Sequence, residues 1–178
     1  MNRPPHAAVS MPDPTNRMTE GWHCLHLYYR VNAVALAALT PEQREQGKEE
    51  LTAALDPDGD GAPERLQVSI VSGHKADLGL MLLDPDPLAL DRVQQAVRAT
   101  GLGAVLDLDW SFVSITEVSE YVPSVEEYAE RLQKEGTSTD DPTYAPKLAA
   151  YEGRLPAMNQ QRLYPDFPDL PVFSFYPM

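Results

Sequence analysis

The sequence predicts an α+β domain in which an antiparallel sheet carries helices on one of its faces. Segments with period-two alternation of apolar residues, typical of half-buried strands, are interleaved with segments whose apolar residues recur at helical spacing. Turn-forming residues separate these segments. A chain of 178 residues is long enough to give one such domain its own hydrophobic core.

The first strand and the first helix have clear signals. Residues 22–30 are dense in aromatic and β-compatible residues, which predicts a strand. Thr40 can cap a helix that begins at Pro41, and Gln43 completes a capping box. We expect this helix to run to about Leu55.

The remaining elements complete a recognisable order. Apolar residues alternate over 66–70 and again over 78–82, which predicts a hairpin. A second helix is expected from about Pro87, with Gly101 as its C-cap candidate. Residues 110–118 predict a fourth strand. The order strand, helix, strand, strand, helix, strand is that of a ferredoxin-like βαββαβ domain with its helices on one face.

The segments flanking this domain, which we place at 21–121, differ from it in composition. Residues 1–20 are rich in Pro, Asn, Ser and Met without periodicity, so we expect a disordered tail. In the segment 122–171, a capping box at Ser124 predicts a helix that ends at Gly136. The proline-rich remainder, 137–171, is expected to be an extended arm. Residues 172–178 are β-prone and are predicted to be the first strand of a second half that is missing.

Composition limits the classes of partner and the compartment. With 27 acidic and 14 basic residues the net charge is −13, which disfavours nucleic-acid binding. No run approaches the roughly 18 apolar residues of a membrane-spanning helix, and no signal-peptide pattern is present. The single cysteine, Cys24, cannot form an internal disulfide. We therefore expect a cytoplasmic protein that binds neither nucleic acid nor membranes.

The sequence predicts no metal site. Residues 56–61 match the first half of a calcium-binding loop, but Gln67 stands where the loop needs a bidentate Glu. His23 and His26 lie three residues apart on a predicted strand, so they point to opposite faces. Cys24 and His26 share a face, but two ligands are fewer than a zinc site requires.

Two residues near the end of the chain have chemistry that could serve an active site. Arg162 offers a planar, permanently charged guanidinium that suits a carboxylate. Tyr176 offers a phenol that can act as an acid or be oxidised to a radical beside a metal cofactor. From the residues alone, a surface arginine and a tyrosine packed in a strand are the simpler interpretation.

Four strings, in order along the chain, resemble the chlorite dismutase-like family, and the last resembles its coproheme decarboxylase branch. They are Gly21-Trp22 with Leu25-His26-Leu27-Tyr28-Tyr29, residues 72–78, residues 112–121, and Arg162-Leu163-Tyr164-Pro165 with Phe175-Tyr176-Pro177-Met178. The resemblance implies two ferredoxin-like halves in one subunit, often assembled as a pentamer. It therefore implies as partners other copies of the chain, a C-terminal half, or both.

The resemblance also implies an activity and a set of site residues. The activity is peroxide-dependent conversion of two propionates of iron-coproporphyrin III (coproheme) to vinyl groups, which yields heme b. Tyr176 corresponds to the radical-forming catalytic tyrosine, and Arg162 to an arginine that holds a propionate. Met178 and Tyr121 correspond to substrate contacts. The iron-ligating histidine belongs to the second half, so we expect residues 1–178 alone not to turn over coproheme.

Two alternatives to this activity stay open. One is a non-catalytic ferredoxin-like module that binds a partner or a small ligand through its sheet. The other is a heme peroxidase or chlorite-degrading activity within the same family, against which the string Tyr176-Pro177-Met178 argues.

Overall fold

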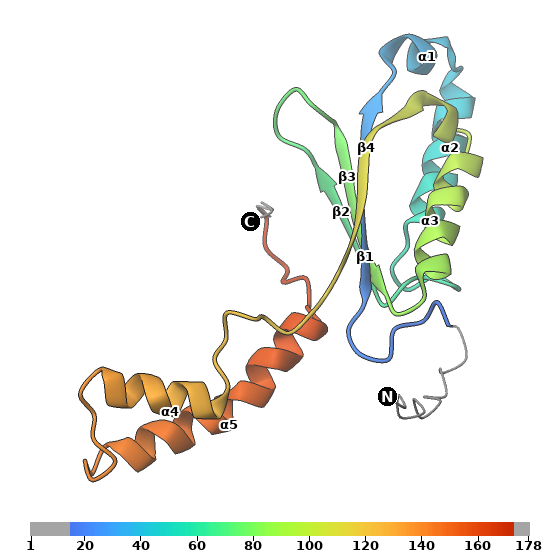
Figure 1. Ribbon diagram of the computed structural model, residues 1–178. Helices are drawn as coiled ribbons and strands as arrows, with labels where there is room; N and C mark the ends of the chain where they lie inside the picture. Colours follow the sequence, from blue (N-terminus) through green and yellow to red (C-terminus); the bar gives the residue numbers. More distant parts are fainter. Residues whose placement is uncertain (1–14, 173–178) are drawn as a thin grey trace, which may run out of the picture.

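Four antiparallel strands form one sheet in the order β2-β3-β1-β4 (Figure 1). The computed structural model describes residues 15–172. The strands are β1 (His23–Val31), β2 (Arg65–Ile70), β3 (Leu78–Asp84) and β4 (Leu106–Ile115). The helices are α1 (Ala33–Ala38), α2 (Pro41–Ala54), α3 (Pro87–Ala99), α4 (Val125–Lys134) and α5 (Tyr144–Leu163), with a 3₁₀ turn at Gly103–Val105. The four strands, together with α2 and α3, confirm the predicted ferredoxin-like α+β arrangement.

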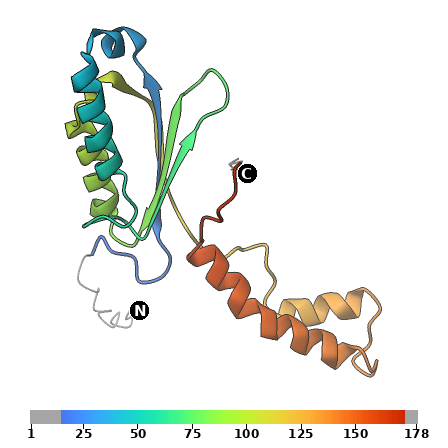
Figure 2. The ribbon, with the colours of Figure 1, turned by 180° about the vertical axis from the view of Figure 1, so that it is seen from behind.

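Helices α2 and α3 cover one face of the sheet (Figures 1 and 2). Alternation along β1 directs Leu25, Leu27 and Tyr29 toward these helices, where all three are buried. The same core takes in Leu80 and Leu82 of β3, and it is closed by the apolar stripe of α3. Each fully buried leucine contributes on the order of 1.5–3 kcal/mol relative to an exposed one, so this layer stabilises the domain most.

The hairpin of β2 and β3 forms as predicted. Leu66 pairs with Leu82, Val68 with Leu80, and Ile70 with Leu78. The helix expected from Thr40 is also confirmed, because the Thr40 side chain accepts from the Gln43 amide and the Gln43 side chain accepts from the Thr40 amide. Gly101, the predicted C-cap of α3, lies one residue after the observed C-cap. Thr100 is the C-cap, and the Gly101 amide instead donates to Glu50 Oε2 of α2 at 2.6 Å.

Two features near β4 differ from the prediction. Helix α1 was not expected; the side chain of Asn32 caps it by accepting from the Ala35 amide at 3.0 Å. Strand β4 spans Leu106–Ile115 rather than 110–118, because its ladder follows β1 from the pair Val31–Leu106 to the pair His23–Ile115. The length of the partner strand, rather than local propensity, sets where β4 ends.

The expectation of an extended arm over 137–171 is wrong for most of that segment, because residues 144–163 form the 20-residue helix α5. Pro146 lies in its first turn, where a backbone amide has no intrahelical acceptor to lose. Pro156 lies inside the helix. Helix α5 packs against α4, whose capping box at Ser124 and terminal Gly136, with φ of +93°, agree with the prediction.

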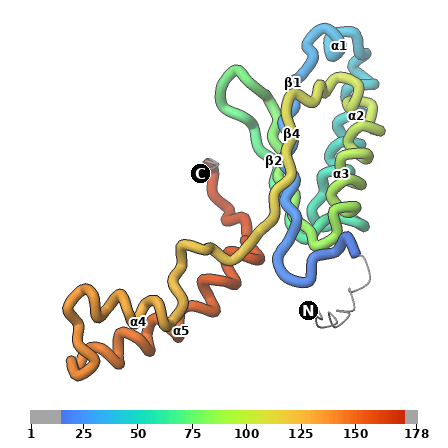
Figure 3. Tube along the Cα trace, in the orientation of Figure 1, coloured from blue at the N-terminus to red at the C-terminus, as the bar shows by residue number. Residues whose placement is uncertain are grey.

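The α4–α5 hairpin projects away from the sheet, as the chain trace shows (Figure 3). Tyr128 and Tyr151 stack between the two helices with ring centroids 4.1 Å apart. The Tyr151 hydroxyl donates to the Pro123 carbonyl. Within the hairpin only Leu132 and Tyr151 are buried along its length, and Leu163 is buried at its base.

The base of the hairpin is joined to the sheet at Thr116, directly after β4. The Thr116 hydroxyl accepts from the Trp22 amide at 2.7 Å and donates to the Leu163 carbonyl at 2.8 Å. The Gly21 amide also donates to the Tyr164 hydroxyl at 3.3 Å. The start of the domain, the end of β4 and the end of α5 therefore meet at one point.

None of the helices in the described part of the chain has the length and apolar character needed to cross a membrane.

Candidate functional site

The face of the sheet turned away from α2 and α3, here called the open face, carries the candidate site. Because side chains alternate along each strand, the residues that β1 does not direct into the core point to this face. Strand pairing places the neighbouring side chains of β3 and β4 beside them. The open face consists mainly of Cys24, His26, Tyr28, Met81, Trp110 and Phe112.

A continuous row of rings crosses the open face from β1 to β4. Tyr28 lies 5.4 Å from Trp110, and Trp110 lies 4.7 Å from Phe112, measured between ring centroids. Phe112 stacks on His26 at 4.0 Å with an interplanar angle of 6°. Trp110 is 53% exposed. Such a row presents flat aromatic surface to any group that packs on this face.

Cys24 and His26 form a buried pair on the open face, as their spacing on one strand predicts. The Cys24 Sγ and His26 Nε2 atoms are 3.1 Å apart, and His26 is only 2% exposed. Burial raises the pKa of the Cys24 thiol to about 11, against a smaller opposing effect from a hydrogen bond with Ser114. Burial lowers the pKa of His26 to about 4. Both shifts favour the neutral forms near pH 7, which argues against a thiolate–imidazolium nucleophile at this pair.

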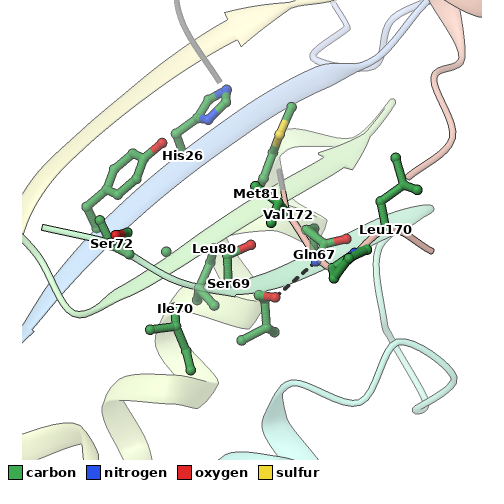
Figure 4. Close-up of a pocket in the computed structure, with 14 residues that line it drawn as sticks. His26, Gln67, Ser69, Ile70, Ser72, Leu80, Met81, Leu170 and Val172 are labelled. Atoms are coloured by element: carbon green, nitrogen blue, oxygen red, sulfur yellow. Dashed lines mark hydrogen bonds between the residues drawn. The ribbon is translucent and has the colours of Figure 1, made fainter. Parts of the chain in front are cut away.

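A cavity of about 650 Å³ lies between the open face and residues 170–172 (Figure 4). His26 and Tyr28 line it from β1, and Met81 lines it from β3. Gln67 lines it from β2, where its side-chain amide donates to the Val68 carbonyl at 3.0 Å. Among the described residues that line the cavity, most are apolar and none is an Asp, Glu, Lys or Arg, so the cavity suits an apolar occupant better than a free anion.

The structure describes two of the four residues predicted for the site. Arg162 lies in the last turn of α5 and is exposed. Tyr121 lies between β4 and α4 and is 87% exposed. Neither lines the cavity. Tyr176 and Met178 lie outside the described residues.

A second, smaller crevice lies where α5 meets the edge of the sheet, and the sequence analysis missed it. The Arg65 guanidinium lies 5.2 Å above the Trp22 ring and donates through Nε to Asp166 Oδ1 at 2.9 Å. The side chains of Gln160 and Gln161 complete the crevice. These residues are scattered between the start of the domain, β2 and the far end of α5, so no local pattern in the sequence brings them together.

Comparison with known proteins identifies the family. The model of the family described as chlorite dismutase matches residues 44–178, which is more than half of the chain. A heme-binding protein from Thermus thermophilus is similar in structure, with a TM-score of 0.51, 25% sequence identity and coverage of 78% of this chain. A chlorite dismutase variant from Candidatus Nitrospira defluvii also has a TM-score of 0.51, with 15% identity and coverage of 80% of this chain.

The chain is shorter than these similar proteins. It covers 52% of the Thermus thermophilus protein and 68% of the Nitrospira chlorite dismutase. The resemblance inferred from the sequence strings and the match of the family model agree on the family. The coproheme decarboxylase branch stays a prediction. This chain belongs to the chlorite dismutase family.

Proposed function

We propose that this chain takes part in heme b formation as the first part of a coproheme decarboxylase. Family membership carries the proposal, since one structural relative is described as a heme-binding protein. The strings at Arg162 and at Tyr176-Pro177-Met178 favour the decarboxylase branch over a chlorite-degrading activity.

The proposed reaction balances with hydrogen peroxide as the oxidant. Each propionate (–CH₂–CH₂–COO⁻), with one peroxide and one proton, gives a vinyl group, carbon dioxide and two waters. When bound, the iron porphyrin is both the substrate and the redox centre that activates peroxide. In this proposal Tyr176 takes a hydrogen atom from the propionate β-carbon after its own phenol has been oxidised. The bond that then breaks joins the carboxylate to the adjacent carbon.

Arg162 suits the role of a propionate anchor. It is exposed at the end of α5 and makes no ion pair within residues 15–172. On a chain with a net charge of −13, a carboxylate needs such a placed guanidinium to bind. Tyr121 is exposed and could add a phenol donor to a second propionate.

In this proposal Arg162 and Tyr121 contact the periphery of the porphyrin, and neither His26 nor His23 binds its iron. His26 is buried, faces Cys24 at 3.1 Å and stacks on Phe112. The His23 ring lies 3.2 Å from the Asn16 carbonyl. We therefore assign neither His23 nor His26 as the iron ligand. In this proposal the ligand comes from the second half of the enzyme.

The proposal is tested by supplying the missing iron ligand from solution. The chain is titrated with iron-coproporphyrin III with and without imidazole, peroxide is added, and the masses of the porphyrin products are measured by mass spectrometry. We expect no turnover without imidazole, and with imidazole loss of carbon dioxide and two hydrogens per propionate. Tyr176→Phe should abolish this loss, whereas Tyr144→Phe on α5 should not.

A separate measurement checks the anchor. Arg162→Ala should weaken porphyrin binding about tenfold or more, the loss expected for a charge-assisted contact of about 1.5–3 kcal/mol. The matched control is Arg154→Ala on the same helix. Absence of saturable binding with imidazole, together with an Arg162→Ala variant that behaves like the parent, would contradict the proposal. That result would favour the alternative of a non-catalytic binding module, for which the aromatic open face is the supporting feature.

A further inference from the structure

The segment 164–172, which follows α5, is attached to the edge of the sheet by contacts that centre on Arg65 and Trp22. The Arg65 guanidinium of β2 donates through Nε and Nη2 to Asp166 Oδ1, with the Nε contact at 2.9 Å. It also lies over the Trp22 ring, 5.2 Å from the ring centroid. Tyr164 meets the same ring edge-on, with centroids 5.2 Å apart. The sheet therefore holds the chain directly after α5 through an ion pair and an aromatic contact.

Arg65 is held in place by contacts other than the one with Asp166. Its Nη1 donates to the Glu64 carbonyl at 2.7 Å, and its guanidinium packs on Trp22, which is only 8% exposed. The Asp166 side chain is 81% exposed, against 34% for Arg65. An exposed ion pair usually gains little, because two flexible side chains must be ordered to form it. Here one partner is already ordered, so the main effect of the pair falls on the placement of Asp166 and its neighbours in the chain.

The end of α5 that meets the sheet carries Arg162. The α4–α5 hairpin projects from the sheet and approaches it at the end of α5 (Figure 1). Leu163 is buried there, and its carbonyl accepts from the Thr116 hydroxyl, directly after β4, at 2.8 Å. Asp166, four residues after Arg162, adds an attachment to β2 at the other edge of the sheet. Two attachments to different strands limit rotation of the α5 end about either one.

We propose that Arg65 is a positioning residue, which through Asp166 and Trp22 fixes the end of α5, and with it Arg162, relative to the sheet. This inference rests on the proposed function in one respect, the binding of a propionate by Arg162. The fixing of the α5 end does not depend on that role and is measured without porphyrin. A guanidinium on a fixed helix end loses less conformational freedom when a carboxylate binds, so its contact with a propionate is tighter.

Hydrogen exchange at the end of α5 tests the positioning directly. Asp166→Asn removes the charge of the pair at nearly constant shape, and Arg65→Met removes the guanidinium. Each should speed amide exchange of residues 160–164 about two- to fivefold, and the double variant should exchange no faster than either single one. Asp166→Glu, which keeps the carboxylate, should restore most of the protection. The matched control, Glu135→Gln, breaks an exposed ion pair on α4 and should leave residues 160–164 unchanged.

Trp22 gives a spectroscopic readout of the same contacts. The chain has two tryptophans, so Trp110→Phe leaves Trp22 as the only one. In that chain we expect acrylamide quenching of the Trp22 emission to rise with Asp166→Asn and to stay constant with Glu135→Gln. A role of Asp166 in overall stability alone would not change this quenching under native conditions.

A double-mutant cycle with Arg162 separates this inference from the proposed function. The affinity for iron-coproporphyrin III is measured in the presence of imidazole. Asp166→Asn should weaken binding about threefold in the parent chain, and it should have no effect in the Arg162→Ala chain, where no guanidinium is left to position.

The inference is overturned if Asp166→Asn and Arg65→Met leave the exchange of residues 160–164 unchanged, whatever the porphyrin result. It is equally overturned if Asp166→Asn changes the porphyrin affinity by the same factor with and without Arg162, because the pair then does not act through that residue. If the parent chain binds no porphyrin, the proposed function fails, and the exchange rates still decide whether Arg65 fixes the end of α5.

Discussion

The ferredoxin-like domain and the α4–α5 hairpin are stabilised in different ways. The domain has a buried layer of leucine, valine and tyrosine side chains between its sheet and α2 and α3. The hairpin relies on one stacked tyrosine pair, one buried leucine and the capping box of α4. Two helices with so little shared core are marginal on their own. The domain should therefore behave as the stable scaffold, and the hairpin as a unit that opens first.

The largest expected effect is loss of a core side chain from the domain. Leu82 is 0% exposed at the centre of the layer, so Leu82→Ala should lower the free energy of unfolding by about 2–5 kcal/mol. The counterpart in the hairpin, Leu132→Ala, should mainly speed amide exchange in α4 and α5. Chemical denaturation and hydrogen exchange on both variants test the comparison. Equal global losses would show that the two regions unfold as one.

The second effect is a pH dependence of stability that arises from His26 in the domain. Because the pKa of His26 falls to about 4 on folding, the unfolded chain binds the proton more readily between that value and the ordinary value of about 6.5. The resulting stability is fully present above about pH 6.5 and is lost as the pH falls toward 4, by up to about 3 kcal/mol. His26→Gln should remove this component from a pH series of denaturation curves. An unchanged series would contradict it.

The raised pKa of Cys24 acts at the other end of the pH scale. The folded chain keeps the thiol proton up to about pH 11, so this contribution is lost as the pH rises above about 9. Stability from the Cys24–His26 pair should therefore be greatest between these two limits. Cys24→Ser, followed by denaturation at pH 8 and pH 10, should show a smaller loss between the two than the parent does.

A smaller effect is expected at the junction between the two regions. Gly21 has a φ of +73°, and a Cβ added there would lie 2.7 Å from the Thr116 carbonyl oxygen. Gly21→Ala should cost about 1–3 kcal/mol through strain and displacement of that carbonyl. Gly153→Ala on α5 is the control, because its Cβ would meet nothing within 4 Å. Thermal unfolding of both variants tests this prediction. A Gly21→Ala variant as stable as the Gly153→Ala variant would contradict it.

The smallest effect is expected at a helix cap of the hairpin. The Ser124 hydroxyl accepts from the Glu127 amide at 3.2 Å, so Ser124→Ala should destabilise α4 by about 1 kcal/mol. Local exchange of the α4 amides should rise about fivefold while global stability stays nearly constant. A matching fall in global stability would show instead that the hairpin belongs to the same cooperative unit as the domain.

Local signals in the sequence predicted the domain well. The capping box at Thr40, the hairpin of residues 66–70 and 78–82, and the shared face of Cys24 and His26 all depend on residues close together in the sequence. Helix α5 was missed because two prolines outweighed its helical spacing, although one of them lies in the permissive first turn.

The site was predicted less well than the fold. The open face joins residues of β1, β3 and β4 that are far apart in the chain, so its row of rings depends on strand order rather than on local sequence. The crevice at Arg65 and Asp166 spans 101 residues. The roles of Arg162, Tyr121, Tyr176 and Met178 came from resemblance rather than from geometry, and they stay predictions.

The hydrogen bond from Thr116 to Leu163 marks a place where the chain between these two residues can be changed in length. It joins two positions 47 residues apart in sequence, so the segment between them, which includes α4 and α5, begins and ends at the same place. The length of that segment has little effect on where the chain continues toward residue 172. Relatives could lengthen, shorten or replace the hairpin without redirecting the segment after it, and a protein engineer could exchange it for a tight turn.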